Sequence, residues 1–368
     1  MTVVVTQNNI TSPNANVTAL TVGTANGLNF PNAGPLSNRN LIINGAMQVS
    51  QRGTTGTVTN AKNYLVDRYY GIAQNANVTQ SQESSVVATG FKNSLKFEVT
   101  SAGNTGYLQC VQRIEGQNMA HLNFGTANAV QFTLSFYVRS SITGNYSIAF
   151  RNGSDNRSYV TTYNIATANT WERKTVTLTG DTTGTWATDN GHGMSVIWTL
   201  GYSTATSSTD QWTATANFAA SSSVDLYETN GATWYLTGVQ LEVGSVATPF
   251  EHRSYGDELA RCQRYFMRYT HVTTGADGGI YQVAGWTSNN AYGAIRFPTT
   301  MRTGPSFSYN GGVFYTNGIV DSSITLTQLG SSVHAAEVQV TDITVSGGDA
   351  GWVRLNTSGH HMSFSAEL

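Results

Sequence analysis

Short segments in which apolar and polar residues alternate recur along most of this 368-residue chain. The longest covers 233–243, where Val239 and Leu241 fall on one face and Gln240 on the other. A period of two is what a half-buried β-strand requires, because successive side chains point to opposite sides of a sheet. The same pattern predicts further strands at 95–100, 131–139, 146–150, 176–178, 196–200 and 224–226.

The composition favours strands and turns over helices. Charged residues make up only 11% of the chain, against roughly a quarter in ordinary soluble domains. Hydrophobic residues at 39% are enough to build cores, so the chain lacks the signature of a disordered protein. Its 37 glycines, with abundant Thr, Ser and Asn, supply β-structure and turns. We therefore predict an all-β protein whose main unit is an antiparallel jelly-roll β-sandwich of roughly eight strands.

The hydrophobic spacing changes once, after Asp257. Leu259, Cys262, Phe266 and Tyr269 recur at intervals of three and four, which is typical of one face of a helix. We expect a jelly-roll sandwich over 40–252, a short connecting helix over 253–270, and a second, smaller C-terminal β-sandwich or barrel over 271–368.

Residues 1–39 differ from the rest because they hold isolated apolar residues and no charge before Arg39. Such a segment cannot bury a core of its own. We expect an extended N-terminal arm that docks on a partner, partly by strand addition. The alternative is a flexible leader.

Two blocks of sequence resemble a known family. The first is 40–53 (NLIINGAMQVSQRG) with 64–69 (YLVDRY), and the second is 235–244 (YLTGVQLEVG) with 247–251 (ATPFE) and 255–265 (YGDELARCQRY). They are similar to a signature of bacteriophage and prophage structural proteins, namely tail-fibre or appendage proteins with a jelly-roll domain like carbohydrate-binding modules. The resemblance implies a virion protein made in the host cytoplasm, assembled as a homotrimer and joined to other virion proteins through residues 1–39.

The predicted helix has two candidate roles. Ser254 and Asp257 resemble a capping box, and Asp257 is placed to pair with Arg261. The helix is then either a solvated connector or an oligomer helix that packs Leu259, Cys262, Phe266 and Tyr269 around a three-fold axis. The family resemblance favours the second role.

Several functional classes are excluded by what the sequence lacks. The net charge is −2 with no basic run, which argues against nucleic-acid binding. No apolar segment approaches the ~20 residues needed for membrane insertion. Cys110 and Cys262 are expected to be free thiols. No cofactor motif is present, and the pair His360 and His361 would face opposite sides of a strand, so no metal site is expected.

The sequence does not predict an enzyme. It shows no phosphate-binding loop, no nucleophile elbow and no zinc-protease motif. Glycosidase carboxylates can be imagined at Asp67, or at Asp155 or Asp181 with Asp189, but 21 acidic residues make such pairs easy to find.

Glycan binding is the activity that the sequence favours, because sugars stack on aromatic rings and hydrogen-bond to planar polar groups. The first set of candidate residues is Trp186, Asp189, Asn190, Tyr202, Asp210 and Trp212. For the tryptophans, packing at the end of the sandwich core is the alternative. The second set is Trp286, Tyr292, Tyr315 and Trp352 of the C-terminal domain, which in a fibre is expected to be the distal one.

The sequence therefore predicts a tail fibre or appendage of a tailed bacteriophage that attaches to a host-surface glycan. Two alternatives stay open. One is a capsid decoration or head-fibre protein anchored by the same arm, and the other is a polysaccharide depolymerase.

Overall fold

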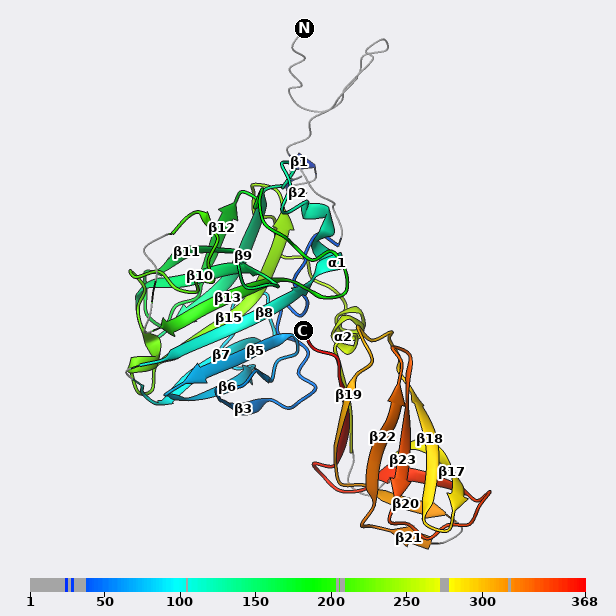
Figure 1. Ribbon diagram of the computed structural model, residues 1–368. Coiled ribbons are helices and arrows are strands. Elements are labelled where there is room, and N and C mark those ends of the chain that lie inside the picture. The colour runs from blue at the N-terminus through cyan, green and yellow to red at the C-terminus, as the bar shows by residue number, and fades with distance from the viewer. Residues whose placement is uncertain are drawn as a thin grey trace.

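The structure is a computed structural model, and it describes residues 24–25, 28–29, 38–103, 105–202, 205, 209–271, 278–316 and 319–368. Almost all of the regular structure is β, in two domains that meet beside helix α2 (Tyr255–Gln263), as Figure 1 shows. The predicted fold class is confirmed. No helix in the described part of the chain is long and apolar enough to cross a membrane. Most of the predicted N-terminal arm lies outside the described residues, apart from a small hairpin of β1 (Thr24–Ala25) and β2 (Leu28–Asn29).

The N-terminal domain is a jelly-roll sandwich of two antiparallel sheets. The seven-stranded sheet has the order β14 (Trp212–Thr213), β11 (Ser158–Ile165), β10 (Gly144–Asn152), β13 (His192–Tyr202), β8 (Tyr107–Glu115), β5 (Tyr69–Gln74), β4 (Asn63–Tyr64). The six-stranded sheet has the order β12 (Glu172–Leu178), β9 (Phe132–Ser140), β15 (Thr233–Val243), β7 (Ser94–Ser101), β6 (Asn77–Glu83), β3 (Thr55–Val58). Short helical turns lie at α1 (Gly116–Met119), η1 (Ala120–Leu122) and η2 (Leu226–Glu228).

The facing surfaces of the two sheets form one hydrophobic core. Trp198 on β13 and Trp234 on β15 are both fully buried in it. Cys110 lies in the same core as a free thiol, and Cys262 is also buried and free, as expected. Burial raises the pKa of both thiols well above the ordinary value, so they stay protonated. Neither cysteine is therefore a reactive nucleophile.

The C-terminal domain is a second, smaller pair of open antiparallel sheets. Its three-stranded sheet has the order β16 (Phe266–Thr270), β25 (His361–Ser365), β19 (Ser306–Asn310). Its seven-stranded sheet has the order β21 (Ile319–Asp321), β20 (Val313–Thr316), β24 (Ala350–Leu355), β17 (Gly278–Thr287), β18 (Asn290–Arg296), β23 (Ala335–Thr341), β22 (Thr325–Ser331). A separate core, which includes Phe314, Val338 and Phe364, fills the space between them.

The connecting helix is shorter than predicted. It ends at Gln263, and residues 266–270 form strand β16, which pairs with β25. Phe266 and Tyr269 therefore belong to the C-terminal domain, and the predicted oligomer stripe of Leu259, Cys262, Phe266 and Tyr269 does not exist as one helix face. The cap is as predicted, because Ser254 Oγ accepts the Asp257 main-chain N–H at 3.2 Å. Arg261, however, donates to Asn38 Oδ1 at 2.9 Å, a contact other than the predicted pair with Asp257.

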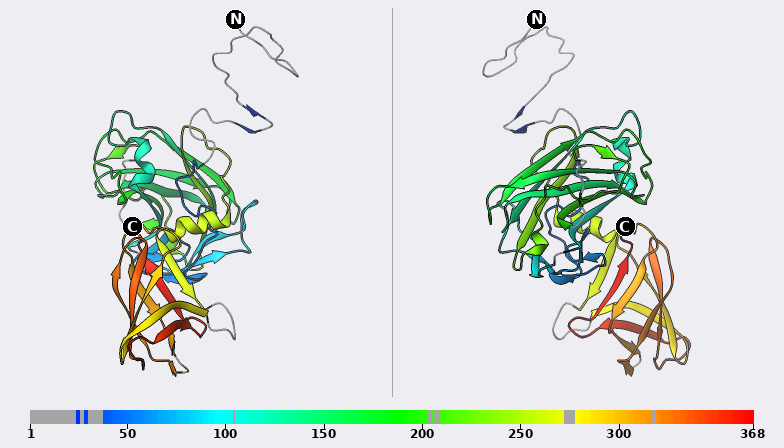
Figure 2. Two further views of the ribbon diagram at one scale, coloured as in Figure 1. Left: turned by 90° about the vertical axis from the view of Figure 1, so that its right-hand side faces the viewer. Right: turned by 60° about the vertical axis from the view of Figure 1, so that its left-hand side comes forward.

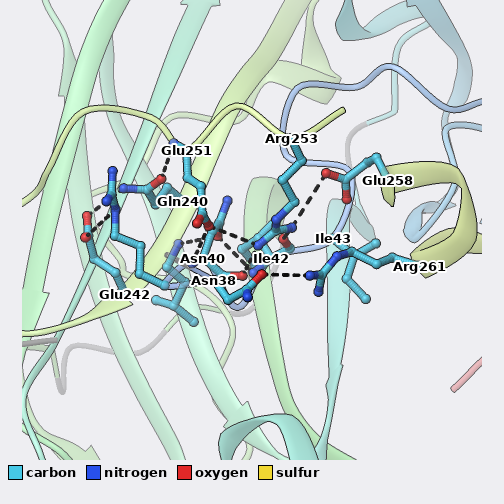
Figure 3. A network of polar contacts seen from close by, with 12 residues as sticks. Asn38, Asn40, Ile42, Ile43, Gln240, Glu242, Glu251, Arg253, Glu258 and Arg261 are labelled. Atoms are coloured by element: carbon cyan, nitrogen blue, oxygen red, sulfur yellow. Dashed lines mark hydrogen bonds and ion pairs between the residues drawn. The ribbon is translucent and has the colours of Figure 1, made fainter. Parts of the chain in front are cut away.

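The two sequence blocks that carry the family resemblance lie side by side (Figure 3). Asn40 is buried and joins them, because its amide donates to the Val239 oxygen at 3.0 Å and its Oδ1 accepts from Leu241 N at 3.0 Å. Gly45 approaches β15 so closely that a Cβ there would lie 2.2 Å from the Val239 oxygen. The Arg253 guanidinium adds a bond to the Ile42 oxygen at 3.0 Å.

Helix α2 is fixed to the same network. The Glu258 carboxylate accepts from Asn44 N at 2.5 Å and lies 3.6 Å from Arg253 Nη1. The Asn44 amide in turn donates to the main-chain oxygens of Val49 and Asp67, at 2.8 and 2.9 Å. The residues of the two blocks therefore have structural roles, since they fix residues 40–45 to β15, the last strand of the sandwich, and to helix α2.

Buried ionic groups connect the two domains. Glu115, at the end of β8, is fully buried and accepts from both the Arg264 guanidinium and the Tyr265 hydroxyl, the latter at 2.7 Å. Arg68 is 1% exposed and pairs with Glu367. Both views in Figure 2 place α2 at this junction, beside the C-terminal end of the chain.

Candidate functional site

The first six predicted glycan-binding residues do not form one site. Trp186 is only 7% exposed, and its ring packs edge-on against Phe124 and Trp212 at centroid distances of 4.9 and 5.4 Å. Trp212 is half-buried, and its indole N–H donates to the Thr179 oxygen at 2.9 Å. The two tryptophans close one end of the sandwich core, which was the alternative interpretation, and the prediction that they stack on a sugar is not supported.

The acidic and amide members of the set are engaged within the protein. Asp189 accepts from Gly191 N at 2.9 Å, and Asp210 accepts from the Thr161 hydroxyl at 2.6 Å. Asn190 exchanges hydrogen bonds of 3.0 and 3.1 Å with Arg302 of the C-terminal domain, so it belongs to the domain junction. Of the six residues, Tyr202 lines the pocket described next.

A pocket of about 260 Å³ opens on the outer face of the seven-stranded sheet of the sandwich, over β5, β8, β13 and β10. Its floor is a row of cross-strand neighbours, in which Val111 lies opposite both Tyr70 and Ile197. These side chains point away from the core, because Cys110 and Trp198 at the alternate positions are completely buried inside it. We call this feature the outer-face pocket.

Three aromatic rings stand around one end of the outer-face pocket. Tyr107 on β8 faces Tyr202 on β13, with ring centroids 6.2 Å apart, and Phe218 lies 5.6 Å beyond Tyr202. All three residues are half-buried, so part of each remains accessible to a ligand. Gln109, two residues from Tyr107 on the same strand, adds a planar amide. Such rings offer apolar faces to sugar C–H groups, and the amide offers a partner to hydroxyls.

Cations line the pocket from Phe218 to Tyr70, and we call the end at Tyr70, with Lys62 and Arg113, its cationic end. Arg151 pairs with the exposed Asp155 at 2.8 Å and lies over the Phe218 ring, 3.8 Å from its centroid. Lys62 and Arg113 lie 5.8 and 5.7 Å from the Tyr70 ring centroid. Burial, followed by the positive charge of Arg113, lowers the pKa of Lys62. Three cations therefore face one carboxylate among the described residues that line the pocket.

A histidine and a serine meet at the pocket edge. His192 Nε2 lies 2.9 Å from Ser195 Oγ, which is within hydrogen-bonding distance. Burial, and then the charges of Arg113, Lys62 and Arg151, lower the pKa of His192 to about 3. A group with that pKa is a weak general base at neutral pH. In the described part of the chain no carboxylate hydrogen-bonds to the His192 ring, so the pair lacks the third group that orients the base in a catalytic triad.

The second predicted set lies together on one surface of the C-terminal domain. On the outer face of its seven-stranded sheet, Trp352 of β24 lies opposite Tyr315 of β20 and Gln282 of β17. The alternate residues Phe314 and Val353 are fully buried. Tyr292 lies opposite Ala284, two residues along from Gln282 on β17, and therefore shares this face.

Trp286 completes this surface, which we call the aromatic face (Trp286, Tyr292, Tyr315 and Trp352). Its ring meets that of Tyr292 at right angles, with centroids 6.2 Å apart. Trp286 is 73% exposed and Trp352 is 42% exposed. Large exposed aromatic side chains on one sheet face indicate an interaction surface.

The outer-face pocket was largely missed by the sequence analysis, although its signal is present in β8. The odd positions 107, 109, 111 and 113 hold Tyr, Gln, Val and Arg, whereas the even positions hold Leu, Cys, Gln and Ile. One face of this strand therefore mixes an aromatic, an amide and a guanidinium. Its neighbours in space, on β5 and β13, lie roughly 40 and 85 residues away in sequence, and only the register brings them together.

The chain is similar in structure to several solved proteins. No protein-family model matches the chain, and no curated protein matches it either. One similar structure is the enzymatically active domain of tailspike protein 4 from bacteriophage CBA120, with 13% identity and a TM-score of 0.33 over 56% of this chain and 21% of that chain. The present chain thus matches about a fifth of the length of that tailspike domain.

Two other similar structures are carbohydrate-binding modules. One is TmCBM61 in complex with β-1,4-galactotriose, with 7% identity and a TM-score of 0.29 over 56% of this chain and 100% of that chain. The other is the family 11 module from Clostridium thermocellum in complex with a mixed-linked tetrasaccharide, with 10% identity and a TM-score of 0.28 over 54% of this chain and 98% of that chain. The assignment of a jelly-roll sandwich rests on the strand topology given above.

Proposed function

We propose that this chain is a non-catalytic glycan-binding protein, and that it serves as an appendage of a tailed-bacteriophage virion. The observation that carries the binding proposal is the outer-face pocket, where Tyr107, Tyr202 and Phe218 stand beside Gln109 and the cations. Its volume of about 260 Å³ lies just below the roughly 300–1,000 Å³ of typical small-molecule sites. A pocket of this size suits a short segment of a sugar chain.

The described residues that line the pocket include no pair of acids, which supports a binding role over hydrolysis. Glycosidases of the common kinds place two carboxyl groups across the scissile bond. Asp155 is the one carboxylate among the described lining residues of the pocket, and it is engaged by Arg151. Asp181, a further candidate, is buried and forms a double hydrogen bond with Arg157. Asp67 is buried at the domain junction beside Arg52.

The aromatic face is a second candidate binding surface. It lies on the outer side of the C-terminal sheet, which Figure 1 places away from the sandwich. In an appendage anchored by its N-terminal arm, this face would meet the host first. The 73% exposure of Trp286 is the observation that favours it.

The virion assignment rests on the two sequence blocks of the resemblance. The proposal also includes assembly as a homotrimer and attachment to other virion proteins through the N-terminal arm, residues 1–39. A capsid decoration protein would use the same arm on the capsid lattice, and a depolymerase would cleave the glycan that it binds. Particles assembled with a chain that lacks residues 1–39 test the arm, because normal incorporation of that chain would contradict the anchoring role.

Binding of the full chain to a glycan array tests the activity itself. We expect retention of a subset of glycans by the wild type, loss of that binding in Tyr202→Ala, and unchanged glycan chain length after incubation. Shortened glycan products would favour the depolymerase alternative. Retention that is lost in Trp352→Ala and kept in Tyr202→Ala would move the site to the aromatic face.

A further inference from the structure

The arrangement of charge in the outer-face pocket indicates which class of glycan it takes. The chain as a whole has a net charge of −2. The pocket nevertheless gathers Lys62, Arg113 and Arg151 around a single carboxylate, Asp155. Asp155 is matched by Arg151 at 2.8 Å, and Lys62 Nζ donates to the Leu368 oxygen at 3.2 Å, so neither Lys62 nor Arg113 is neutralised by a carboxylate among the described residues that line the pocket.

Arg113 has no carboxylate partner among the described residues, and its side chain hydrogen-bonds to the Tyr70 hydroxyl. Its guanidinium lies 5.7 Å from the Tyr70 ring centroid, and among the described residues it forms no ion pair. Its Nε is buried and has no hydrogen-bond partner within the described structure. A guanidinium at the edge of a pocket, without a carboxylate to neutralise it, favours an anionic ligand.

The register places Arg113 and Arg151 on either side of the same residue. Ser195 on β13 lies opposite Arg113 on β8 and opposite Arg151 on β10. The two arginines therefore stand two strands apart, or about 10 Å between backbones. An anionic group held over β13 would therefore lie within reach of Arg113 and beside the Arg151–Asp155 pair.

A second observation indicates a positive electrostatic potential at this end of the pocket. The pKa of His192, beside Ser195, is lowered to about 3, first by burial and then by Arg113, Lys62 and Arg151. A positive electrostatic potential that opposes protonation of an imidazole also favours the binding of an anion at the same place.

We propose that the outer-face pocket binds an acidic glycan, with a sugar carboxylate held at the cationic end by Arg113 and Lys62 while a neighbouring sugar ring stacks on Tyr202 and Tyr107. This inference rests on the proposed glycan-binding function and narrows its ligand to chains with a carboxylate. Arginine suits this role, because its planar fork matches the geometry of a carboxylate.

The test compares each acidic glycan with its own neutral form. Oligogalacturonides, oligoguluronides and sialylated oligosaccharides are arrayed beside their carboxyl-reduced counterparts, and the full chain is applied. We expect binding to at least one acidic form and binding at least about tenfold weaker to its reduced form. Affinity for the acidic form is expected to fall as salt concentration rises.

Two matched pairs of variants locate the effect. Arg113→Gln and Lys62→Gln are expected to weaken binding of the acidic form about tenfold or more, whereas Arg139→Gln on the six-stranded sheet and Lys92→Gln on an exposed loop are expected to change it less than twofold. Thermal denaturation of each variant checks that it folds. Equal binding of acidic and reduced forms would overturn the inference and leave glycan binding intact. Retention of no glycan in either form would overturn the proposed function as well.

Discussion

The outer-face pocket and the aromatic face both lie on the outer side of a seven-stranded antiparallel sheet, but they differ in cover and charge. In the sandwich, the segment around Phe218 lies over part of the sheet, because Thr199 Oγ1 donates to the Phe218 oxygen at 2.8 Å and Ala220 N donates to Ser147 Oγ at 2.8 Å. The pocket begins where this cover ends. In the C-terminal domain no described segment is bonded across the aromatic face in this way, and Trp286 and Trp352 are exposed.

One architecture thus produces two kinds of surface. A partly covered sheet leaves a small recess in which side chains are partly desolvated and their charges act strongly. An uncovered sheet leaves a broad face whose binding depends on apolar contact, with charges that water screens. We expect selectivity from the pocket and broad, weak adhesion from the aromatic face.

Loss of a buried carboxylate at the junction of the two domains should lower stability most, because this junction holds both surfaces on one body. Glu115→Ala leaves the Arg264 guanidinium and the Tyr265 hydroxyl without their buried acceptor. We expect a loss of about 3–5 kcal/mol in the free energy of unfolding, measured by chemical denaturation. Glu337→Ala, which removes an exposed carboxylate of the C-terminal sheet, is the control and is expected to cost less than about 0.5 kcal/mol. Similar small effects in both variants would show that the junction does not couple the domains.

The second effect is a pH dependence of the free energy of unfolding, caused by His192 at the edge of the outer-face pocket. The pKa of His192 is about 3 in the folded chain and ordinarily 6.5. Below pH 6.5 the unfolded chain binds a proton that the folded chain does not, so stability falls with acidification by up to about 1.4 kcal/mol per pH unit. Above pH 7 this histidine is neutral in both the folded and the unfolded chain, so it does not change the free energy of unfolding with pH.

Denaturation curves between pH 7 and 4.5 measure this contribution. His192→Asn is expected to flatten the decline relative to the wild type, whereas His334→Asn, at an exposed site of the C-terminal domain, is expected to leave it unchanged. Parallel declines in the wild type and His192→Asn would contradict the assignment.

The third effect is a change in glycan affinity, which shows which of the two surfaces binds the glycan. Tyr202→Ala removes an aromatic wall of the outer-face pocket and is expected to weaken glycan binding about tenfold or more. Trp352→Ala removes a ring from the aromatic face and is expected to change the same affinity less than twofold. Isothermal titration with a glycan identified on the array measures both. The reverse order of effects would assign recognition to the C-terminal domain.

The smallest effect tests the exposure of the aromatic face. Trp286→Ala removes a side chain that is 73% exposed, so the free energy of unfolding is expected to change by less than about 0.5 kcal/mol. Trp186→Ala, which empties a buried position of the sandwich, is the contrast and is expected to cost about 3–5 kcal/mol. A large loss in Trp286→Ala would mean that this ring is packed against the protein.

The sequence predicted the fold class well, because alternation reports a half-buried strand wherever it occurs. It misjudged the helix end, because Phe266 and Tyr269 continue a helical spacing although strand β16 pairs with β25, about 95 residues away. Local spacing carries no information about such distant pairing.

The candidate site was predicted less well, for related reasons. Trp186 and Tyr202 stand in similar polar surroundings in the sequence, but one ring packs on Phe124 and the other lines a pocket. The four residues of the aromatic face were named from the sequence as aromatic residues of the C-terminal domain, and the strand register brings them onto one sheet face. The cationic end of the pocket depends on the register of β8, β10 and β13, which composition does not report.

The pairing of β16 with β25 has a mechanical consequence. These strands are the first and last of the C-terminal domain, so both ends of the domain meet the sandwich at one place. A force applied to the far end of the domain would be transmitted to the sandwich through the main chain at Arg264 and, in parallel, through the ion pair between Glu367 and Arg68. The load is then shared between the paired strands β16 and β25 and a buried ion pair, so the junction between the two domains would resist being pulled apart.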